Sequence, residues 1–460
     1  MLPPFEIVAT QRPVDLVAPR TAVPCPPGQL HPLPRPAPYA ALRAVVAGDV
    51  AVQERVDLVL TSGEDRFVGW WDPVTGTVGL EVATAGRTTR HVSRRAGHVT
   101  HRPTALALTL TGTHLTLFCR SEDGWQARAR HDLAGRCDTH TEGWAAALHA
   151  GAPQAPTGLL RDVVAGGFGQ LGLRDLRFVS TARGDLVRDG EHLLLSATSA
   201  GPGFFDTAHT SLWRLHPETL ALEHLSDLWF RRSGEQGRTG VFGDHATHVV
   251  RDGDTWLVAT STWGDFDRAA RPVRVVLAET TADLTSGEHV LDARDLPLPT
   301  DGFRSVGVWD PHLLRTGDGW RVGYVSARKY FTFHPVLAAG PTLDDLQVTA
   351  ADTGRRATEG TTWLELDGRL RVLASDGRDG ARGARERFVV LDEELQEVGT
   401  LDAPYSTNLP WPTLARLADD SWLMATFDGT PAGGEILGYG THGDVVLMRS
   451  TPDVGPPPQD

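Results

Sequence analysis

One short pattern recurs five times in the C-terminal part of the chain, and it restricts the possible fold more than any other feature. Each copy has an apolar run, a tight turn and a second apolar run, which is the pattern of a β-hairpin. The turns lie at Gly190, Gly253, Gly317, Gly368 and Asp420, and successive turns are 63, 64, 51 and 52 residues apart. Repeats of this length that contain only strands are typical of a β-propeller with about four strands in each blade. Five copies therefore predict five blades.

An open β-sandwich with unrelated hairpins is the alternative, because sandwich strands also recur, at intervals of about 8–12 residues. Here the likeness holds between whole units whose turns are at least 51 residues apart. That spacing favours the propeller. Because the innermost strand of every blade lines the propeller axis, the residues that begin the five hairpins are expected to converge on one funnel.

The chain is expected to be all-β, with a jelly-roll-like β-sandwich before the propeller. Residues 41–140 contain successive alternating apolar segments that resemble a sandwich of the concanavalin or laminin-G type. A Pro-rich lead-in occupies residues 1–40, and Gly151, Pro153 and Pro156 mark a boundary. The predicted domains are residues 1–155 for the sandwich and 156–452 for the propeller, followed by a Pro-rich tail at 453–460.

Composition excludes several classes of partner. The formal net charge of −14 argues against nucleic acid, because phosphate binding requires clustered cations. The three cysteines have no metal-ligand spacing, and their odd number gives no disulfide framework. No apolar run approaches the length of a transmembrane helix, about 18 residues or more. The first residues lack the basic and apolar regions of a signal peptide, so a cytoplasmic protein is expected, or a secreted one if a leader precedes this sequence.

Four of the five hairpins carry a carboxylate near the start. These residues are Asp185, Asp244, Asp310 and Glu359, and the fifth hairpin has Asn408 and Trp411 instead. Radial repetition would bring such distant carboxylates together at the propeller axis.

The dipeptides Asp310-Pro311 and Glu359-Gly360 open consecutive repeats, and there they resemble motifs of the five-bladed propeller glycosidases. This group comprises glycoside hydrolase family 43 and relatives that include the fructan-cleaving family 32. The resemblance covers the predicted propeller. It implies a general base or nucleophile on the first blade, an Asp on the third blade that holds substrate and tunes the acid, and a general-acid Glu on the fourth blade.

Carried onto this chain, these roles fall on Asp185, Asp310 and Glu359 respectively. Asp185 lies only five residues before its turn, whereas Asp310 and Glu359 lie seven and nine residues before theirs. Asp244 also lies nine residues before its turn, so it is the alternative base. Cleavage of a glycosidic bond needs one protonated and one ionised carboxyl group, and a third carboxylate nearby raises the pKa of the acid.

The resemblance implies a glycoside hydrolase that cleaves arabinofuranosyl- or xylosyl-containing glycans with inversion. A retaining, fructofuranosidase-like hydrolase or transferase is one alternative, and a non-catalytic sugar-binding propeller is another. Aromatic rings stack on sugar faces. The residues expected to contact the carbohydrate are His245, His248, Trp263, Trp309, His312, Arg328, Asn408 and Trp411. No cofactor is expected, although an axial ion such as Ca²⁺ stays open because some members of the group carry a metal ion on the axis.

Overall fold

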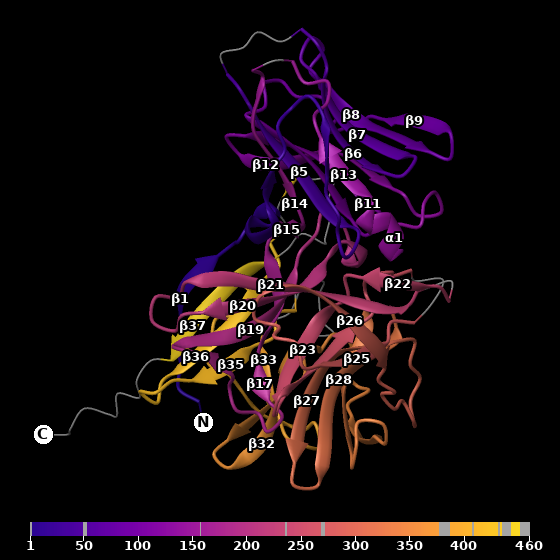
Figure 1. Ribbon diagram of the computed structural model, residues 1–460. Helices are drawn as coiled ribbons and strands as arrows, with labels where there is room; N and C mark the ends of the chain where they lie inside the picture. The colour runs from indigo at the N-terminus through magenta and orange to yellow at the C-terminus, as the bar shows by residue number, and fades with distance from the viewer. Residues whose placement is uncertain are drawn as a thin grey trace, which may run out of the picture.

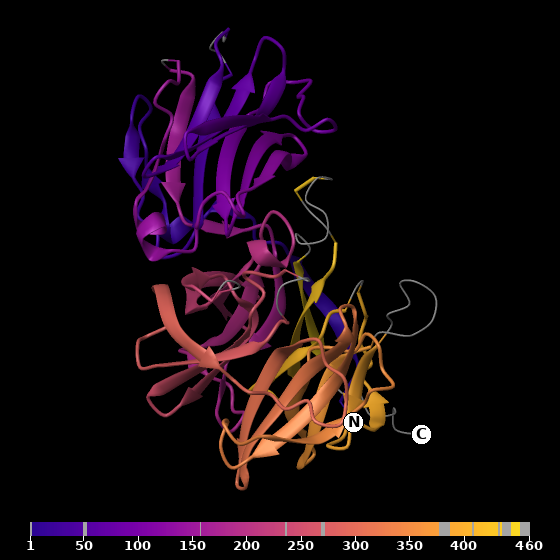
Figure 2. The same cartoon turned by 90° about the vertical axis from the view of Figure 1, so that its right-hand side faces the viewer.

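The structure is a computed structural model that describes residues 2–48, 53–156, 158–234, 237–267, 272–376, 387–406, 409–430, 433–434 and 443–450. The prediction of an all-β chain is confirmed, because the one α-helix within these ranges, α1 (Glu142–Ala146), has only five residues. No helix in this part of the chain has the length and apolar character needed to cross a membrane. The strands form two bodies, one above the other, and β1 (Phe5–Gln11) and β37 (Asp444–Ser450), the first and last strands described, lie in the lower one (Figures 1 and 2).

The upper body, called the N-terminal domain below, is built from two six-stranded sheets. In sheet order, the first contains β12 (Gly124–Asp132), β11 (His114–Ser121), β10 (Ala105–Thr111), β5 (Tyr39–Val46), β14 (Leu160–Gly166) and β3 (Val23–Pro24). The second contains β4 (Leu30–Pro32), β13 (Leu148–Gly151), β6 (Val56–Ser62), β7 (Asp65–Asp72), β8 (Thr77–Thr84) and β9 (Arg87–His91).

Alternation along the strands explains how these two sheets pack. In β10, Leu106, Leu108 and Leu110 enter the apolar cluster shared with residues of the second sheet. Ala107 points to the opposite face and belongs to a different cluster, which reaches the lower body. Side chains in a strand alternate between faces, so one segment can serve both the domain core and the domain contact.

The lower body, called the C-terminal domain, contains five four-stranded antiparallel units; three are separate sheets, and units 1 and 2 are joined by a parallel strand pair within one eleven-stranded sheet. Unit 1 is β16 (Leu173–Phe178), β19 (His192–Ser199), β20 (His209–Leu215) and β21 (Leu222–Ser233). Unit 2 is β23 (His245–Asp252), β24 (Thr255–Ser261), β25 (Val275–Thr280) and β26 (Gly287–Asp295). Unit 3 is β27 (Val308–Thr316), β28 (Gly319–Lys329), β29 (Thr332–Gly340) and β30 (Gln347–Ala351). Unit 4 is β31 (Thr362–Leu366), β32 (Arg369–Ser375), β33 (Phe388–Leu391) and β34 (Glu397–Thr400).

Unit 5 is closed by the beginning of the chain. It consists of β35 (Thr413–Arg416), β36 (Trp422–Asp428), β37 (Asp444–Ser450) and, as its outer strand, β1 (Phe5–Gln11). The pairing runs from Phe5 opposite Ser450 to Gln11 opposite Val445. This places part of the expected irregular lead-in within a C-terminal sheet. Pairing of the two ends of the chain covers an edge of β37 that would otherwise be open.

Strand pairing also moves the boundary predicted between the sandwich and the propeller. β14 (Leu160–Gly166) pairs with β5 of the N-terminal domain, so that domain extends past the expected end at residue 155. The predicted tail at 453–460 lies outside the described residues. Shorter elements complete the chain: β2 (Asp15–Val17), β15 (Phe168–Gln170), β17 (Ser180–Thr181), β18 (Arg188–Asp189), β22 (Thr239–Phe242), η1 (Pro19–Thr21) and η2 (Phe205–Thr207).

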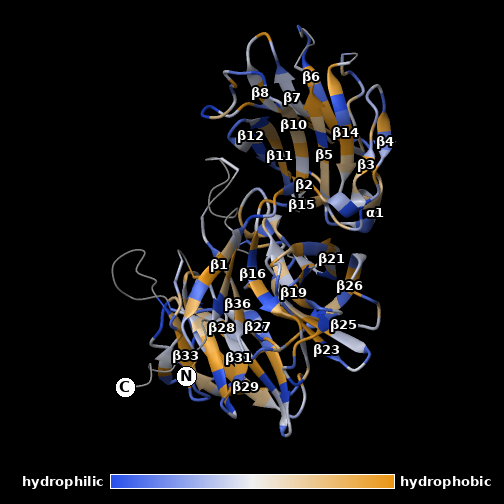
Figure 3. Ribbon diagram, turned by 90° about the vertical axis from the view of Figure 1, so that its left-hand side faces the viewer, coloured by the Kyte–Doolittle hydropathy of each residue, from blue (hydrophilic) through white to orange (hydrophobic). Residues whose placement is uncertain are grey.

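The inner strands of the five units pack around one axis. β16 contacts β35 on one side and β23 on the other, β23 contacts β27, and β27 contacts β31. All five turns predicted from the sequence join consecutive strands, and the turn residues Gly190, Gly253, Gly368 and Asp420 have positive φ. Figure 3 shows the hydrophobic residues concentrated on the strands, where neighbouring units pack together.

The two domains share an apolar and aromatic contact. Tyr39 of β5 is fully buried, and its hydroxyl donates to the Ala208 carbonyl oxygen at 2.9 Å. Its ring lies 4.5 Å from that of Trp229 on β21, and Arg35 forms an ion pair with Glu288 on β26. Burial of this polar hydroxyl with a partner in the other domain makes the contact specific as well as apolar.

Candidate active site

The inner strands of units 1 to 4 begin with the same irregularity. Asp175, Ala246, Asp310 and Gly360 have φ values of +56°, +59°, +54° and +73°. The pairing register of β16, β23 and β27 shifts next to the first three of these residues. Such a bulge turns a side chain out of the sheet, and positive φ at non-glycine residues often marks functional sites.

These bulges border one pocket of about 460 Å³ at the axis. Three carboxylates from three different units reach it: Asp175 from unit 1, Asp310 from unit 3, and Glu359 from the segment leading into unit 4. The other lining residues are Arg174, Phe204, Phe205, His245, Ala246, Trp263, Trp309, Tyr330, Phe331, Phe333, Leu409, Trp411 and Phe427. An apolar, aromatic wall with a few convergent polar groups is the usual character of a small-molecule site.

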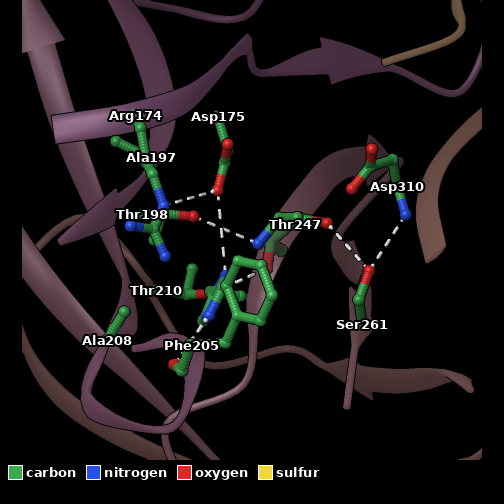
Figure 4. Close-up of polar contacts among 12 residues, drawn as sticks. Arg174, Asp175, Ala197, Thr198, Phe205, Ala208, Thr210, Thr247, Ser261 and Asp310 are labelled. Atoms are coloured by element: carbon green, nitrogen blue, oxygen red, sulfur yellow. Dashed lines mark hydrogen bonds and ion pairs between the residues drawn. The ribbon is translucent and has the colours of Figure 1, made fainter. Parts of the chain in front are cut away.

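Asp310, from unit 3, is the most deeply buried of the three carboxylates, with 3% of the residue exposed. Its backbone N–H donates to Ser261 Oγ at 3.0 Å (Figure 4), and its carboxylate accepts from the backbone N–H of Gly360. Oδ2 is buried without a hydrogen-bond partner. Burial raises the pKa of Asp310 well above its usual range, the negative charges of Glu359 and Asp175 raise it further, and only Arg177 and Gly360 oppose them.

Asp175 experiences the opposite balance. Burial alone would raise its pKa, but His245, Arg174 and Thr198 together lower it to about 2. Arg174 Nε lies 3.4 Å from Asp175 Oδ2 (Figure 4), and His245 Nδ1 lies 3.7 Å from the same oxygen. Asp175 is therefore ionised at neutral pH, whereas Asp310 favours its protonated form. Neighbouring carboxyl groups whose pKa values are pushed apart in this way are suited to acid and base roles.

Glu359 is half-buried and borders the pocket. Ser375 on β32 holds its backbone at two points: the Glu359 N–H donates to Ser375 Oγ at 3.0 Å, and the Ser375 N–H donates to the Glu359 carbonyl at 3.0 Å. Because the backbone of Glu359 is held in place while its side chain is partly exposed, this carboxyl group is well placed to contact a ligand.

The placement predicted for Asp185 is wrong. Asp185 is exposed in the turn after β17 and lines a different groove together with Glu365 and Asp367. Asp244, the alternative base, is fully buried and receives two hydrogen bonds from Arg232, at 2.5 and 2.7 Å. It also accepts the Gly264 N–H at 2.9 Å. A carboxylate paired in this way is structural and has no path to a substrate.

Of the three histidines proposed as sugar contacts, the structure brings His245 alone to the pocket. His248 and His312 are buried below it and stack at 3.9 Å. His248 Nδ1 accepts the Leu313 N–H at 3.0 Å, so this ring joins unit 2 to unit 3. Burial holds the pKa values of both histidines well below the usual range. A neutral ring has one nitrogen that can accept a hydrogen bond, as His248 Nδ1 does here.

The predicted aromatic residues do meet. Trp263, Trp309 and Trp411 all line the pocket, and the rings of Trp263 and Trp309 are 5.3 Å apart. Arg328, on β28, is half-buried and is not among the lining residues. Asn408 lies outside the described residues.

Asp175 is the pocket carboxylate that the sequence analysis missed. Counting back from the turn at Gly190 failed, because β17 and β18 are inserted between β16 and its partner β19. A signal was nevertheless present: Asp175 is followed two residues later by Arg177, just as Asp310 is followed by His312. In the second copy the strand continues through Leu313 and Leu314, whereas β16 ends at Phe178, directly after Arg177.

Among the residues that the structure describes, no group of three or more His, Cys, Asp or Glu side chains is arranged to hold a metal ion. The His248 and His312 rings stack on each other, and the Arg177 guanidinium is near enough to lower the pKa of both.

No protein-family model matches the chain, and no curated protein sequence matches it. Solved structures do resemble it. A family 43 glycoside hydrolase from Xanthomonas citri, complexed with xylose, aligns over 60% of this chain and 86% of its own, with 15% identity and a TM-score of 0.40. An α-L-arabinanase from Penicillium chrysogenum, complexed with arabinobiose, aligns over 90% and 98%, with 10% identity and a TM-score of 0.36. A family 117 glycoside hydrolase from Zobellia galactanivorans aligns over 62% and 87%, with 12% identity and a TM-score of 0.39. At such identities, what the protein does follows from the residues of its own pocket.

Proposed function

We propose that the protein is a glycoside hydrolase whose active site is the pocket bounded by Asp175, Asp310 and Glu359, on a five-bladed propeller formed by the five units. One observation carries the proposal: three carboxylates from three units border one aromatic-walled pocket, and their environments separate an ionised group from a protonated one. Glycosidic cleavage requires that pairing of an acid with a base.

Asp175 acts as the general base, because its pKa of about 2 keeps it ionised. It removes a proton from a water molecule that attacks the anomeric carbon. Glu359 acts as the general acid and gives its proton to the leaving glycosidic oxygen as the carbon–oxygen bond breaks. Asp310 and Glu359 repel each other when both are ionised, so the pair keeps one proton between them, which Glu359 delivers to the leaving oxygen.

The favoured substrates are glycans that contain arabinofuranosyl or xylosyl units. The motifs Asp310-Pro311 and Glu359-Gly360 support this class through their resemblance to the pentose-acting propeller glycosidases. The pocket volume of about 460 Å³ suits a ligand of a few rings at most. Trp263, Trp309 and Trp411 provide flat apolar surfaces on which sugar rings can stack. Inversion of the anomeric centre is part of the proposal.

The test is hydrolysis of a panel of aryl pentosides and pentose oligosaccharides. We expect the wild type to release sugar, and Asp175→Asn and Glu359→Gln each to lower kcat by about 10²-fold or more. Asp185→Asn, an exposed carboxylate away from the pocket, is the matched control and should retain full activity. Proton NMR of the first product formed identifies its anomer and hence the stereochemistry.

Binding of sugars by a wild type that releases none would point to a non-catalytic role for the pocket. Equal loss of activity in Asp185→Asn and Asp175→Asn would contradict the assignment of the base.

A further inference from the structure

The Arg177 side chain is buried in the C-terminal domain, next to the backbone of the pocket residue Asp310. It lies on β16 two residues after Asp175, and only 1% of it is exposed. A buried arginine is costly unless its donors and its charge are compensated. Its contacts show where that compensation comes from.

The guanidinium of Arg177 reaches from unit 1 to units 3 and 4. Nη1 donates to Thr362 Oγ1 at 2.6 Å and to the Thr361 carbonyl at 3.3 Å. Nη2 donates to the Asp310 carbonyl at 3.3 Å. Asp310 carries one pocket carboxylate, and Thr361 follows Glu359 by two residues. One rigid planar group therefore holds the two backbone segments that present Asp310 and Glu359.

The charge of Arg177 also acts on this pair. Arg177 is a cation that opposes the rise in the Asp310 pKa, while Glu359 and Asp175 promote it. Burial lowers the pKa of Arg177 to about 10, against the opposing influence of Asp310 and Asp175, so it stays protonated at neutral pH. The other titratable groups that face it are His248 and His312, whose pKa values burial holds well below the usual range. Arg177 thus meets two neutral rings and two carboxyl groups.

We propose that Arg177 is a positioning residue for glycosidic cleavage: its planar fork sets Asp310 against Glu359, and its charge offsets the repulsion among the pocket carboxylates. The inference rests on the proposed function for its kinetic consequence. Its electrostatic part follows from the position of the buried guanidinium beside Asp310 and can be tested without turnover.

Two substitutions of Arg177 separate the effect of its hydrogen-bonding geometry from the effect of its positive charge. Arg177→Lys keeps the charge but loses the bidentate geometry, so kcat/KM should fall by about 10²-fold, with the alkaline limb of its pH profile unmoved. Arg177→Met loses both, so the same fall should be accompanied by a shift of that limb to higher pH by about one pH unit or more. Arg188→Met, an exposed arginine of the same unit, is the control and should change neither quantity.

Thr362→Val provides a second route if the arginine variants fold poorly. It removes the Nη1 acceptor and leaves the guanidinium charge in place. It should repeat the result for Arg177→Lys, with lower kcat/KM and an unmoved limb. If Arg177→Lys and Arg177→Met lost the same amount of kcat/KM and the alkaline limb moved in neither variant, the proposal would be overturned and Arg177 would be a packing residue.

A ¹³C NMR titration of carboxyl-labelled aspartate gives a readout that does not need activity. The Asp310 carboxyl should titrate at higher pH in Arg177→Met than in the wild type, and at the wild-type pH in Arg177→Lys. Identical titrations in all three proteins would refute the electrostatic role. A wild type without hydrolase activity that still shows the displaced titration would contradict the proposed function and support the role of the charge.

Discussion

Asp206 is predicted to destabilise the folded protein at neutral pH, and its replacement by asparagine to stabilise it. Asp206 lies in η2, next to Phe205 of the pocket, and faces the N-terminal domain. His114 Nδ1 is 3.4 Å from Asp206 Oδ2, and Arg130 and Asp132 on β12 also act on it. Burial raises the Asp206 pKa from 3.8 to about 6, Arg130 lowers it and Asp132 raises it.

The size of the effect follows from the displaced pKa. A rise from 3.8 to about 6 means that the folded state holds the proton more tightly than the unfolded chain. The ionised group therefore costs stability above pH 6, by at most about 3 kcal/mol at about 1.4 kcal/mol per pKa unit. This is an upper bound, because 25% of the side chain is exposed. Between pH 6 and pH 4 the cost disappears as Asp206 takes up its proton.

The assay compares thermal unfolding of Asp206→Asn and the wild type at pH 8 and pH 4. For a chain of this length, about 3 kcal/mol corresponds to about 3 °C in the midpoint. We expect the variant to melt up to about 3 °C higher at pH 8, with most of the gain lost at pH 4.

Asp132→Asn is the matched control in the same cluster. The pKa of Asp132 is lowered despite partial burial, because Thr113, the Ala134 N–H, His114 and Arg130 favour its charged form. Its replacement should therefore destabilise the protein at pH 8. A stabilising effect of Asp206→Asn that is the same at both pH values, or a lower midpoint at pH 8, would refute the reasoning.

Three further predictions concern the pocket and the domain contact. Gly360→Ala should lose nearly all hydrolysis while remaining folded by circular dichroism, because the new Cβ would lie 2.2 Å from Trp411 ring atoms at a φ of +73°; wild-type kcat/KM would contradict this. His245→Ala should move the acidic limb of the kcat/KM profile to higher pH, since His245 helps to hold the Asp175 pKa down; an unmoved limb would count against Asp175 as the base. Tyr39→Phe should lower the free energy of unfolding by about 1 kcal/mol in urea denaturation, since it removes a buried hydrogen bond between the domains; an unchanged midpoint would indicate that the bond is dispensable.

Local pattern was enough to predict much of this protein. Apolar alternation identified the strands, because side chains in a strand alternate between two environments. The turns at Gly253 and Gly368 were recognisable because positive φ favours glycine. Asp310 and Glu359 were found because each opens an uninterrupted inner hairpin, so that distance from the turn reports position at the axis.

Only the tertiary structure decided which third carboxylate and which histidine reach the pocket. Asp175 replaced Asp185 at the pocket because β17 and β18 interrupt the first hairpin, and spacing along the chain cannot show such an insertion. His248 and His245 are three residues apart on one strand, yet a bulge between them sends one to the pocket and the other to a neighbouring amide. Likewise, β1 joins β37 because that strand offers an open edge, and the apolar sequence of β1 does not show which strand it will join. Sequence determined which segments become strands, whereas the packing of the units against one another determined which side chains face the pocket.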